Sequence, residues 1–139
     1  MDVDYEKVVD FAVPRYDGSL CSMEKTTLVV DDNSVTRKIA MMLASKLGFK
    51  TSGATNGQEA VELYRSGQRF DLVIMDMEMP IMDGIDATRV IRSMGAAECI
   101  IIGATASDDE HQKRMFMEAG LNHLLSRPIT KEKLEQLLN

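Results

Sequence analysis

Short apolar runs alternate with amphipathic stretches along the chain from position 26 onward. Continuous apolar runs predict buried strands, and apolar residues three or four positions apart predict helices that pack on them. Five strand and helix pairs can be counted: strands at 26–30, 50–54, 72–75, 100–104 and 123–125, and helices at 35–47, 58–66, 85–94, from 108 or 109 to 119, and 130–138. This repetition predicts an α/β domain with a parallel sheet.

Capping side chains and glycines mark several helix ends. These signals are Asn33 or Ser34 before the first helix, Gly48 after it, Ser107 or Asp108 before the fourth helix and Gly120 after it. Apolar residues of the first helix recur at helical spacing: Ile39, Met42, Leu43 and Leu47. In the second helix Ala60, Val61 and Tyr64 could face the sheet.

The strands differ in polarity, and this difference indicates their places in the sheet. The strand at 72–75 is apolar throughout, as expected where helices cover both faces. The strand at 50–54 is polar. We therefore expect the third strand at the centre of the sheet and the second at an edge.

The length and composition fit one globular domain. The chain has 139 residues, enough for a single core, with 45% apolar and 27% charged residues. Residues 1–25 mix acids with Pro14, Gly18 and Ser19 and show no sustained period, which indicates a flexible leader or a short packed extension. The chain therefore divides into a leader at 1–25 and a domain at 26–139.

The net charge of −6 argues against broad binding to nucleic acid or anionic membranes and favours basic partners or metal cations. The chain start lacks the features of a secretory signal, and no apolar run approaches the roughly 20 residues of a membrane span. We expect an intracellular monomer that is located in the cytoplasm, with the nucleus as an open second location. Cys21 and Cys99 lack a metal-binding pattern, so reduced thiols are expected.

Chemically useful residues follow the strands. Parallel strands joined by helices bring their carboxyl ends to one edge, where ligands bind. The residues expected there are Asp31, Asp32, Asp76, Thr105 and Arg127. They are scattered along the sequence, and the topology gathers them.

Three acids at one point repel each other unless a cation is present. Oxygen ligands alone select a hard cation, and Mg²⁺ suits a solvent-facing edge. We expect Asp31 and Asp32 to hold it, with Asp76 and a main-chain carbonyl near Glu78 as further ligands. A carboxylate beside Mg²⁺ can attack phosphorus, which makes Asp76 the candidate nucleophile. Thr105 and Arg127 could both reach phosphoryl oxygens.

Simpler interpretations exist for the same residues. Asp31 and Asp32 could end a strand and cap a helix, Asp76 could be a solvated turn residue, Thr105 a capping hydroxyl and Arg127 a surface charge. Gly84 is most simply a turn glycine. The methionines Met75, Met77, Met79 and Met82 are interpreted as core and loop filling, and His111 and His123 as surface or core residues.

The ordered set of motifs resembles the receiver domain of two-component response regulators over roughly residues 26–138. The set comprises paired acids after strand one, Asp76-Met77-Glu78-Met79-Pro80 and Asp83-Gly84 after strand three, Thr105-Ala106 after strand four, and a basic residue with Pro128 after strand five. Two segments, Asp76 to Pro80 and Glu118 to His123, are further similar to plant stand-alone receivers that lack an output domain.

This resemblance implies a flavodoxin-like, doubly wound five-stranded parallel sheet of order 2-1-3-4-5 with five helices. Receiver domains are known examples of this fold. It implies that Asp76 accepts a phosphoryl group, with Mg²⁺, from a histidine-containing phosphotransfer protein or a hybrid histidine kinase. Asp31 and Asp32 would be metal ligands, and Thr105 would move toward the phosphate. The protein would act as a regulator or as a phosphate sink.

Two residues depart from the family pattern. Arg127 stands where the family usually has Lys, and its planar fork should alter phosphate coordination. Leu124 stands where many receivers have an aromatic ring, so the usual coupling to the surface of helix four and strand five should be weak.

Two other functions stay open. The first is a Mg²⁺-dependent phosphohydrolase of the aspartyl-phosphate type, in which Glu78 would be the acid/base group. The second is a degenerate receiver that only binds partners and takes up no phosphate.

Overall fold

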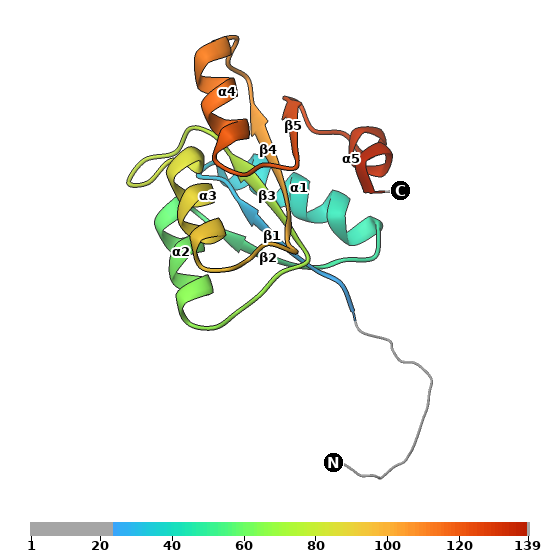
Figure 1. Ribbon diagram of the computed structural model, residues 1–139. Helices are drawn as coiled ribbons and strands as arrows, with labels where there is room; N and C mark the ends of the chain where they lie inside the picture. The colour runs from blue at the N-terminus through green and yellow to red at the C-terminus, as the bar shows by residue number, and fades with distance from the viewer. Residues whose placement is uncertain (1–23, 139) are drawn as a thin grey trace.

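The computed structural model describes residues 24–138 (Figure 1). The strands are β1 (Thr26–Val30), β2 (Lys50–Ala54), β3 (Leu72–Asp76), β4 (Ile100–Thr105) and β5 (His123–Ser126). The helices of this described part are α1 (Ser34–Lys46), α2 (Gly57–Arg65), α3 (Gly84–Ser93), α4 (Glu110–Glu118) and α5 (Lys131–Leu138). All strand pairs are parallel, in the order β2-β1-β3-β4-β5, which confirms the predicted fold. The leader predicted at 1–25 lies outside the described residues apart from Glu24 and Lys25.

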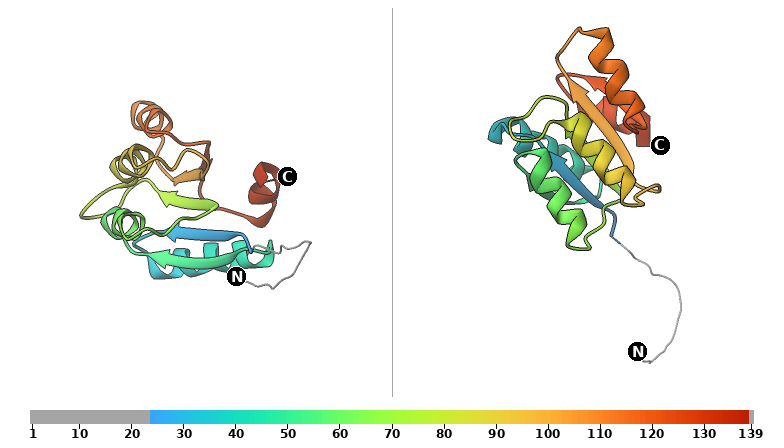
Figure 2. Two further views of the ribbon diagram at one scale, coloured as in Figure 1. Left: turned by 60° about the horizontal axis from the view of Figure 1, so that its bottom comes forward. Right: turned by 60° about the vertical axis from the view of Figure 1, so that its left-hand side comes forward.

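The sheet separates two layers of helices (Figure 2). Because side chains of a strand alternate between its faces, β1 contributes to two cores. Leu28 and Val30 pack with residues of α2, α3 and α4, whereas Val29 packs with residues of α1 and α5. Both faces of the central strands are therefore buried.

The predicted strand positions are correct. β3 lies at the centre, and its residues from Leu72 to Met75 are all buried. β2 lies at one edge and is largely exposed. Because β3 lies between β1 and β4, its last residue, Asp76, lies between the ends of these two strands.

Helix α1 packs on the sheet through small residues. Ala40 and Ala44 are its buried residues, so the helix backbone lies close to the strands. Of the apolar residues that recur at helical spacing in the sequence, Ile39 and Met42 are exposed, so this spacing does not mark the buried face of α1. Together with Val35 they form an apolar stripe on the outer surface of α1, which we call the α1 stripe.

Side-chain caps begin the helices. Asn33 caps α1 as expected, since its Oδ1 accepts from the main-chain N–H groups of Val35 and Thr36. The cap of α4 is Asp109, not Ser107 or Asp108. The hydroxyl of Ser107 instead accepts from the N–H of Asp109 and forms a turn before the helix.

The loop between β3 and α3 contains a strained turn. Ile81 has a φ of 73°, and the N–H of Met82 donates to the carbonyl of Pro80 at 2.8 Å. This is a γ-turn with a positive central φ, which is unfavourable for a β-branched residue. The side chain of Ile81 is 80% exposed, so packing within the described domain does not hold it there.

The two ends of the described chain lie near each other at the amino end of the sheet. Lys25 and Leu138 line one small cavity of about 230 Å³, together with Leu47, Phe49 and Glu135. Among residues 24–138, no helix has the length and apolar character that a membrane span requires.

Candidate functional site

Three carboxylates meet at the carboxyl edge of the sheet. Val30 pairs with Met75 in the register of β1 and β3, so Asp31 and Asp76 leave adjacent strands side by side. One carboxylate oxygen from each of Asp31, Asp32 and Asp76 lies within 4.8 Å of the others. The topology thus gathers the acids as the sequence predicts.

Asp31 is buried and held by the start of α1. Its Oδ1 accepts from the N–H of Asn33 at 2.9 Å, and its Oδ2 accepts from the hydroxyl of Thr36 at 2.9 Å. Arg37 donates to its main-chain oxygen at 2.8 Å. Sequence reasoning missed Thr36 and Arg37, although both stand in the first turns of a helix that follows the acids directly.

Arg127 connects two of the three acids. Its Nη2 lies 2.8 Å from Oδ2 of Asp31 and 3.1 Å from Oδ1 of Asp76. Burial acts to lower the pKa of Arg127, but the Asp76 and Asp31 carboxylates more than offset it, so the pKa is raised. The guanidinium is therefore a fixed positive charge within the cluster and not a free surface charge.

Asp76 is a poorly solvated carboxyl group. Burial raises its pKa to about 6; Arg127 opposes this rise, and the charge of Asp31 adds to it. At neutral pH Asp76 is ionised, and it is a stronger base than an exposed aspartate. A partly buried, ionised carboxylate beside cations has the properties of a nucleophile.

Thr105 ends β4 beside this cluster and is buried. Its Oγ1 accepts from the N–H of Ser107 at 2.9 Å, and its main-chain oxygen accepts from the N–H of Arg127 at 3.0 Å. Thr105 is thus joined to Arg127 through the backbone. Within residues 24–138, no hydrogen bond joins its hydroxyl to Asp76.

The main chain after Asp76 is held from two sides. Met77 donates to the carbonyl of Ala104 at 2.9 Å and accepts from the N–H of Gly84 at 2.9 Å. A Cβ at Gly84 would overlap the main-chain oxygen of Asp76. Gly84 is therefore a close-contact glycine in the first turn of α3, and its interpretation as a turn glycine was wrong. The side chain of the neighbouring Glu78 is exposed.

The donor set of this cluster fits a hard divalent cation. Its ligand atoms are carboxylate oxygens, and no His or Cys takes part in the cluster among the described residues. Oxygen ligands at a partly solvated edge suit Mg²⁺ better than Zn²⁺ or copper. The acid cluster is therefore a candidate Mg²⁺ site.

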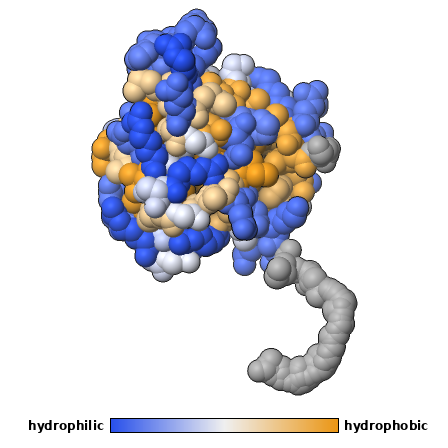
Figure 3. Space-filling view, viewed as in Figure 1, coloured by the Kyte–Doolittle hydropathy of each residue, from blue (hydrophilic) through white to orange (hydrophobic). Residues whose placement is uncertain are grey.

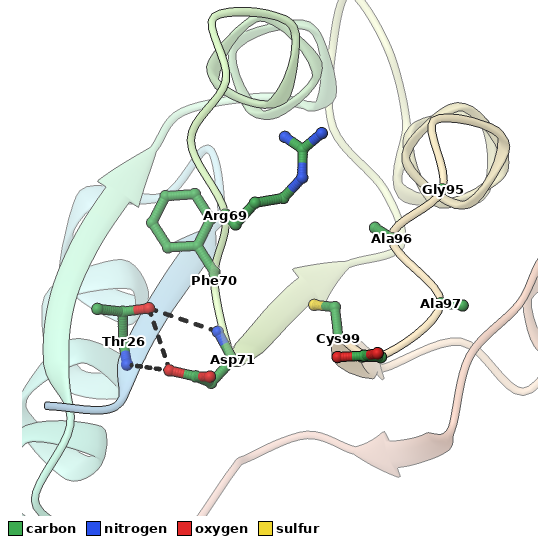
Figure 4. A pocket seen from close by; sticks show the side chains of 9 residues that line it. Thr26, Arg69, Phe70, Asp71, Gly95, Ala96, Ala97 and Cys99 are labelled. Carbon is green, nitrogen blue, oxygen red and sulfur yellow. Dashed lines mark hydrogen bonds between the residues drawn. The ribbon is translucent and has the colours of Figure 1, made fainter. Parts of the chain in front are cut away.

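Another cavity lies at the opposite edge of the sheet, near the amino ends of β3 and β4 (Figure 4). It has a volume of about 520 Å³, and Asp71 at its rim accepts from the N–H of Thr26 at 2.8 Å. Its one thiol, Cys99, is free and buried, and burial raises its pKa. A protonated thiol is unreactive, so Cys99 is not a candidate nucleophile. Cys21 lies outside the described residues.

These features define a flavodoxin-like α/β protein whose carboxyl edge carries an acidic cluster suited to a cation. The chain belongs to the family of response regulator receiver domains, whose model matches residues 27–139. It is 46% identical over 121 residues to two-component response regulator 24 of Arabidopsis thaliana, covering 87% of this chain and 86% of that protein. It is 41% identical over 113 residues to response regulator ARR22 of the same plant, covering 81% of this chain and 80% of that protein.

Two solved structures bear on the site. The receiver domain of the sensor histidine kinase PA1611 from Pseudomonas aeruginosa, with magnesium in its active site cleft, has a TM-score of 0.74 and 29% identity; the match covers 84% of this chain and 95% of that one. A complex of the Saccharomyces cerevisiae phosphotransfer protein Ypd1 with the receiver domain of Ssk1 gives a TM-score of 0.72 and 28% identity, covering 83% and 86%.

Proposed function

We propose that this protein is a phospho-accepting receiver in a histidine-to-aspartate phosphorelay. The observation that carries the proposal is the place of Asp76: a partly buried carboxylate with a raised pKa, beside Arg127 and two further acids. An oxygen of Asp76 attacks the phosphorus of a phosphohistidine whose other ring nitrogen is protonated, the P–N bond breaks with its electron pair going to nitrogen, and neutral imidazole leaves. The product is an aspartyl phosphate.

The other site residues have complementary roles in this transfer. Asp31, Asp32 and Asp76, with the main-chain carbonyl of Glu78, would hold Mg²⁺, which would neutralise charge on the transferring oxygens. Arg127 donates to a phosphoryl oxygen from the position where it now contacts Asp76. The hydroxyl of Thr105, which accepts from the N–H of Ser107, donates its proton to another phosphoryl oxygen.

The phosphoryl donor docks on the α1 stripe. Val35, Ile39 and Met42 are 63%, 45% and 50% exposed, which is unusual for apolar residues on one helix. A groove of about 360 Å³ beside the stripe continues to the site, lined by Thr36, Ile39, Ala40, Leu43, Arg127, Pro128 and Ile129. The surface over α4 is hydrophilic by contrast (Figure 3). The similar Ssk1 receiver is known in complex with a phosphotransfer protein, which supports a donor of this kind.

The open shape of the site disfavours a phosphohydrolase. Such an enzyme needs an acid/base group in an enclosed, water-poor site. Glu78 is the candidate group, and its side chain is exposed. The protein therefore acts as a regulator or phosphate sink and holds its phosphoryl group on Asp76 without turnover of small substrates.

Phosphotransfer from a labelled phosphohistidine donor tests this function. We expect label on the wild type in Mg²⁺, none after Asp76→Asn, and wild-type labelling of the control Asp86→Asn, which changes an exposed acid of α3. Absence of label from the wild type would leave the degenerate receiver as the better account. Steady turnover of small phosphomonoesters would favour the hydrolase.

A further inference from the structure

A second cavity adjoins the acid cluster on the side of α4. It has a volume of about 420 Å³ and is lined by Thr105, Ala106, Ser107, Asp108, Lys113, Leu124, Ser126 and Arg127. Arg127 belongs to the acid cluster, whereas Lys113 belongs to α4. The cavity therefore joins the site to a cation on a neighbouring helix.

Lys113 is weakly held where it lies. Its Nζ is 3.2 Å from Oε2 of Glu110, one helical turn away. The side chain of Glu110 is 80% exposed, and such ion pairs contribute little to stability. The side chain of Lys113 itself is only 30% exposed and lines the cavity. Breaking the ion pair with Glu110 therefore costs little free energy.

Leu124 leaves room for this movement. Its side chain lines the cavity and packs partly against the core. A larger side chain at this position of β5 would occupy the volume between α4 and Thr105. The short aliphatic residue keeps open a path between Lys113 and Thr105.

The site has a use for a second protein cation. The one guanidinium of Arg127 already pairs with both Asp31 and Asp76. A phosphoryl group adds up to about two negative charges. Thr105 offers a hydroxyl proton at the wall of the cavity, since its Oγ1 accepts from Ser107 and has no acceptor of its own in the described part of the chain.

We propose that Lys113 is a second phosphate-binding residue, which reaches the phosphoryl group of Asp76 through the cavity beside Leu124. The proposal rests on the proposed function and adds a residue to that site. Lys113 leaves Glu110, and its ammonium donates to a phosphoryl oxygen on the side where Thr105 lies. Arg127 binds the same group from its place beside Asp31 and Asp76, so two cations share the charge of the phosphoryl group.

Binding of beryllium trifluoride, a phosphoryl analogue that attaches to carboxylates, tests this role in the presence of Mg²⁺. Fluorine NMR of the full chain would measure the affinity. We expect Lys113→Gln to weaken binding about ten-fold, the usual effect of losing one charge-assisted hydrogen bond. Glu110→Gln should bind as tightly as the wild type or more tightly, because it releases Lys113. Lys131→Gln, on α5, is the matched control and should change nothing.

Filling the path is the second arm of the test. Leu124→Phe should weaken binding like Lys113→Gln, and the double variant should be no weaker than either single variant, because both remove the same contact. Equal affinity of Lys113→Gln and the wild type would overturn the proposal, whatever Leu124→Phe does. A wild type that neither binds the analogue nor accepts phosphate would refute the proposed function instead.

Discussion

Nη2 of Arg127 lies 2.8 Å from Oδ2 of Asp31, although the residues are 96 positions apart in the chain. The same nitrogen lies 3.1 Å from Asp76, so one guanidinium offsets the repulsion between two strand-end acids. Through this single nitrogen, Arg127 ties a predicted metal ligand to the predicted acceptor.

Removal of this guanidinium should destabilise the metal-free protein. We expect Arg127→Gln to lower the free energy of unfolding by about 2 kcal/mol in a chelator, because buried acids lose their counter-charge. Mg²⁺ should restore most of the loss, since a bound cation replaces the charge. Urea denaturation with and without Mg²⁺ measures both effects. Arg89→Gln, which breaks an exposed ion pair with Asp86, is the control and should have almost no effect.

Asp76→Asn should stabilise the protein in a pH-dependent manner. The pKa of Asp76 is raised from 3.8 to about 6, so the folded protein binds this proton more tightly than the unfolded chain does. The carboxyl group therefore reduces stability progressively as the pH rises from about 4 to about 6. In a chelator, the free energy of unfolding of the variant should exceed that of the wild type by up to about 3 kcal/mol at pH near 7. The difference should almost vanish below pH near 4, and urea denaturation at several pH values measures it. A pH-independent difference would show that burial does not perturb this group.

The edge position of the site residues was predictable, because apolar runs locate the strands and parallel topology aligns their ends. Asp31, Asp76 and Thr105 all follow strands whose positions the pattern of apolar residues gives correctly. The side-chain geometry was not predictable. That one nitrogen of Arg127 would reach two carboxylates depends on how β5 lies relative to β1 and β3, which local sequence does not encode.

Local competition explains the errors in the helices. Ser107 and Asp108 are good caps, but the hydroxyl of Ser107 accepts from Asp109, and the helix starts later. In α1, Ile39 belongs to the apolar residues at helical spacing but is exposed, whereas the small Ala40 and Ala44 are buried. A surface kept apolar for binding has the same spacing as one buried in a core, so periodicity alone does not distinguish them.

Gly84→Ala should be strongly destabilising. Helix propensity alone predicts a gain of about 1 kcal/mol from this change in α3. The added Cβ would overlap the carbonyl oxygen of Asp76, so we expect a loss of about 2 to 3 kcal/mol and displacement of Asp76. Thermal or urea unfolding shows whether the free energy of unfolding rises or falls. Gly53→Ala is the control, since its Cβ meets only the flexible side chains of Met41 and Arg37.

Ile81→Asn should stabilise the protein. The positive φ of Ile81 costs a β-branched residue about 1 kcal/mol or more, and asparagine tolerates this conformation better. Little burial is lost, because the side chain is exposed. Denaturation should show a gain of about 1 kcal/mol. Ile81→Val retains the branching and should show no gain; equal stabilisation by both variants would contradict the strain account.

Lys25 and Leu138 line one cavity at the amino end of the sheet, remote from the acids at its carboxyl end. Neighbouring termini make a domain easy to insert into a longer chain, because two short linkers suffice to carry it. In this architecture both linkers would leave from the face opposite the acids, so that a host protein attached there would leave the α1 stripe and the acid cluster open. The same geometry makes the protein suitable for circular permutation, with new ends placed in a solvent-exposed loop.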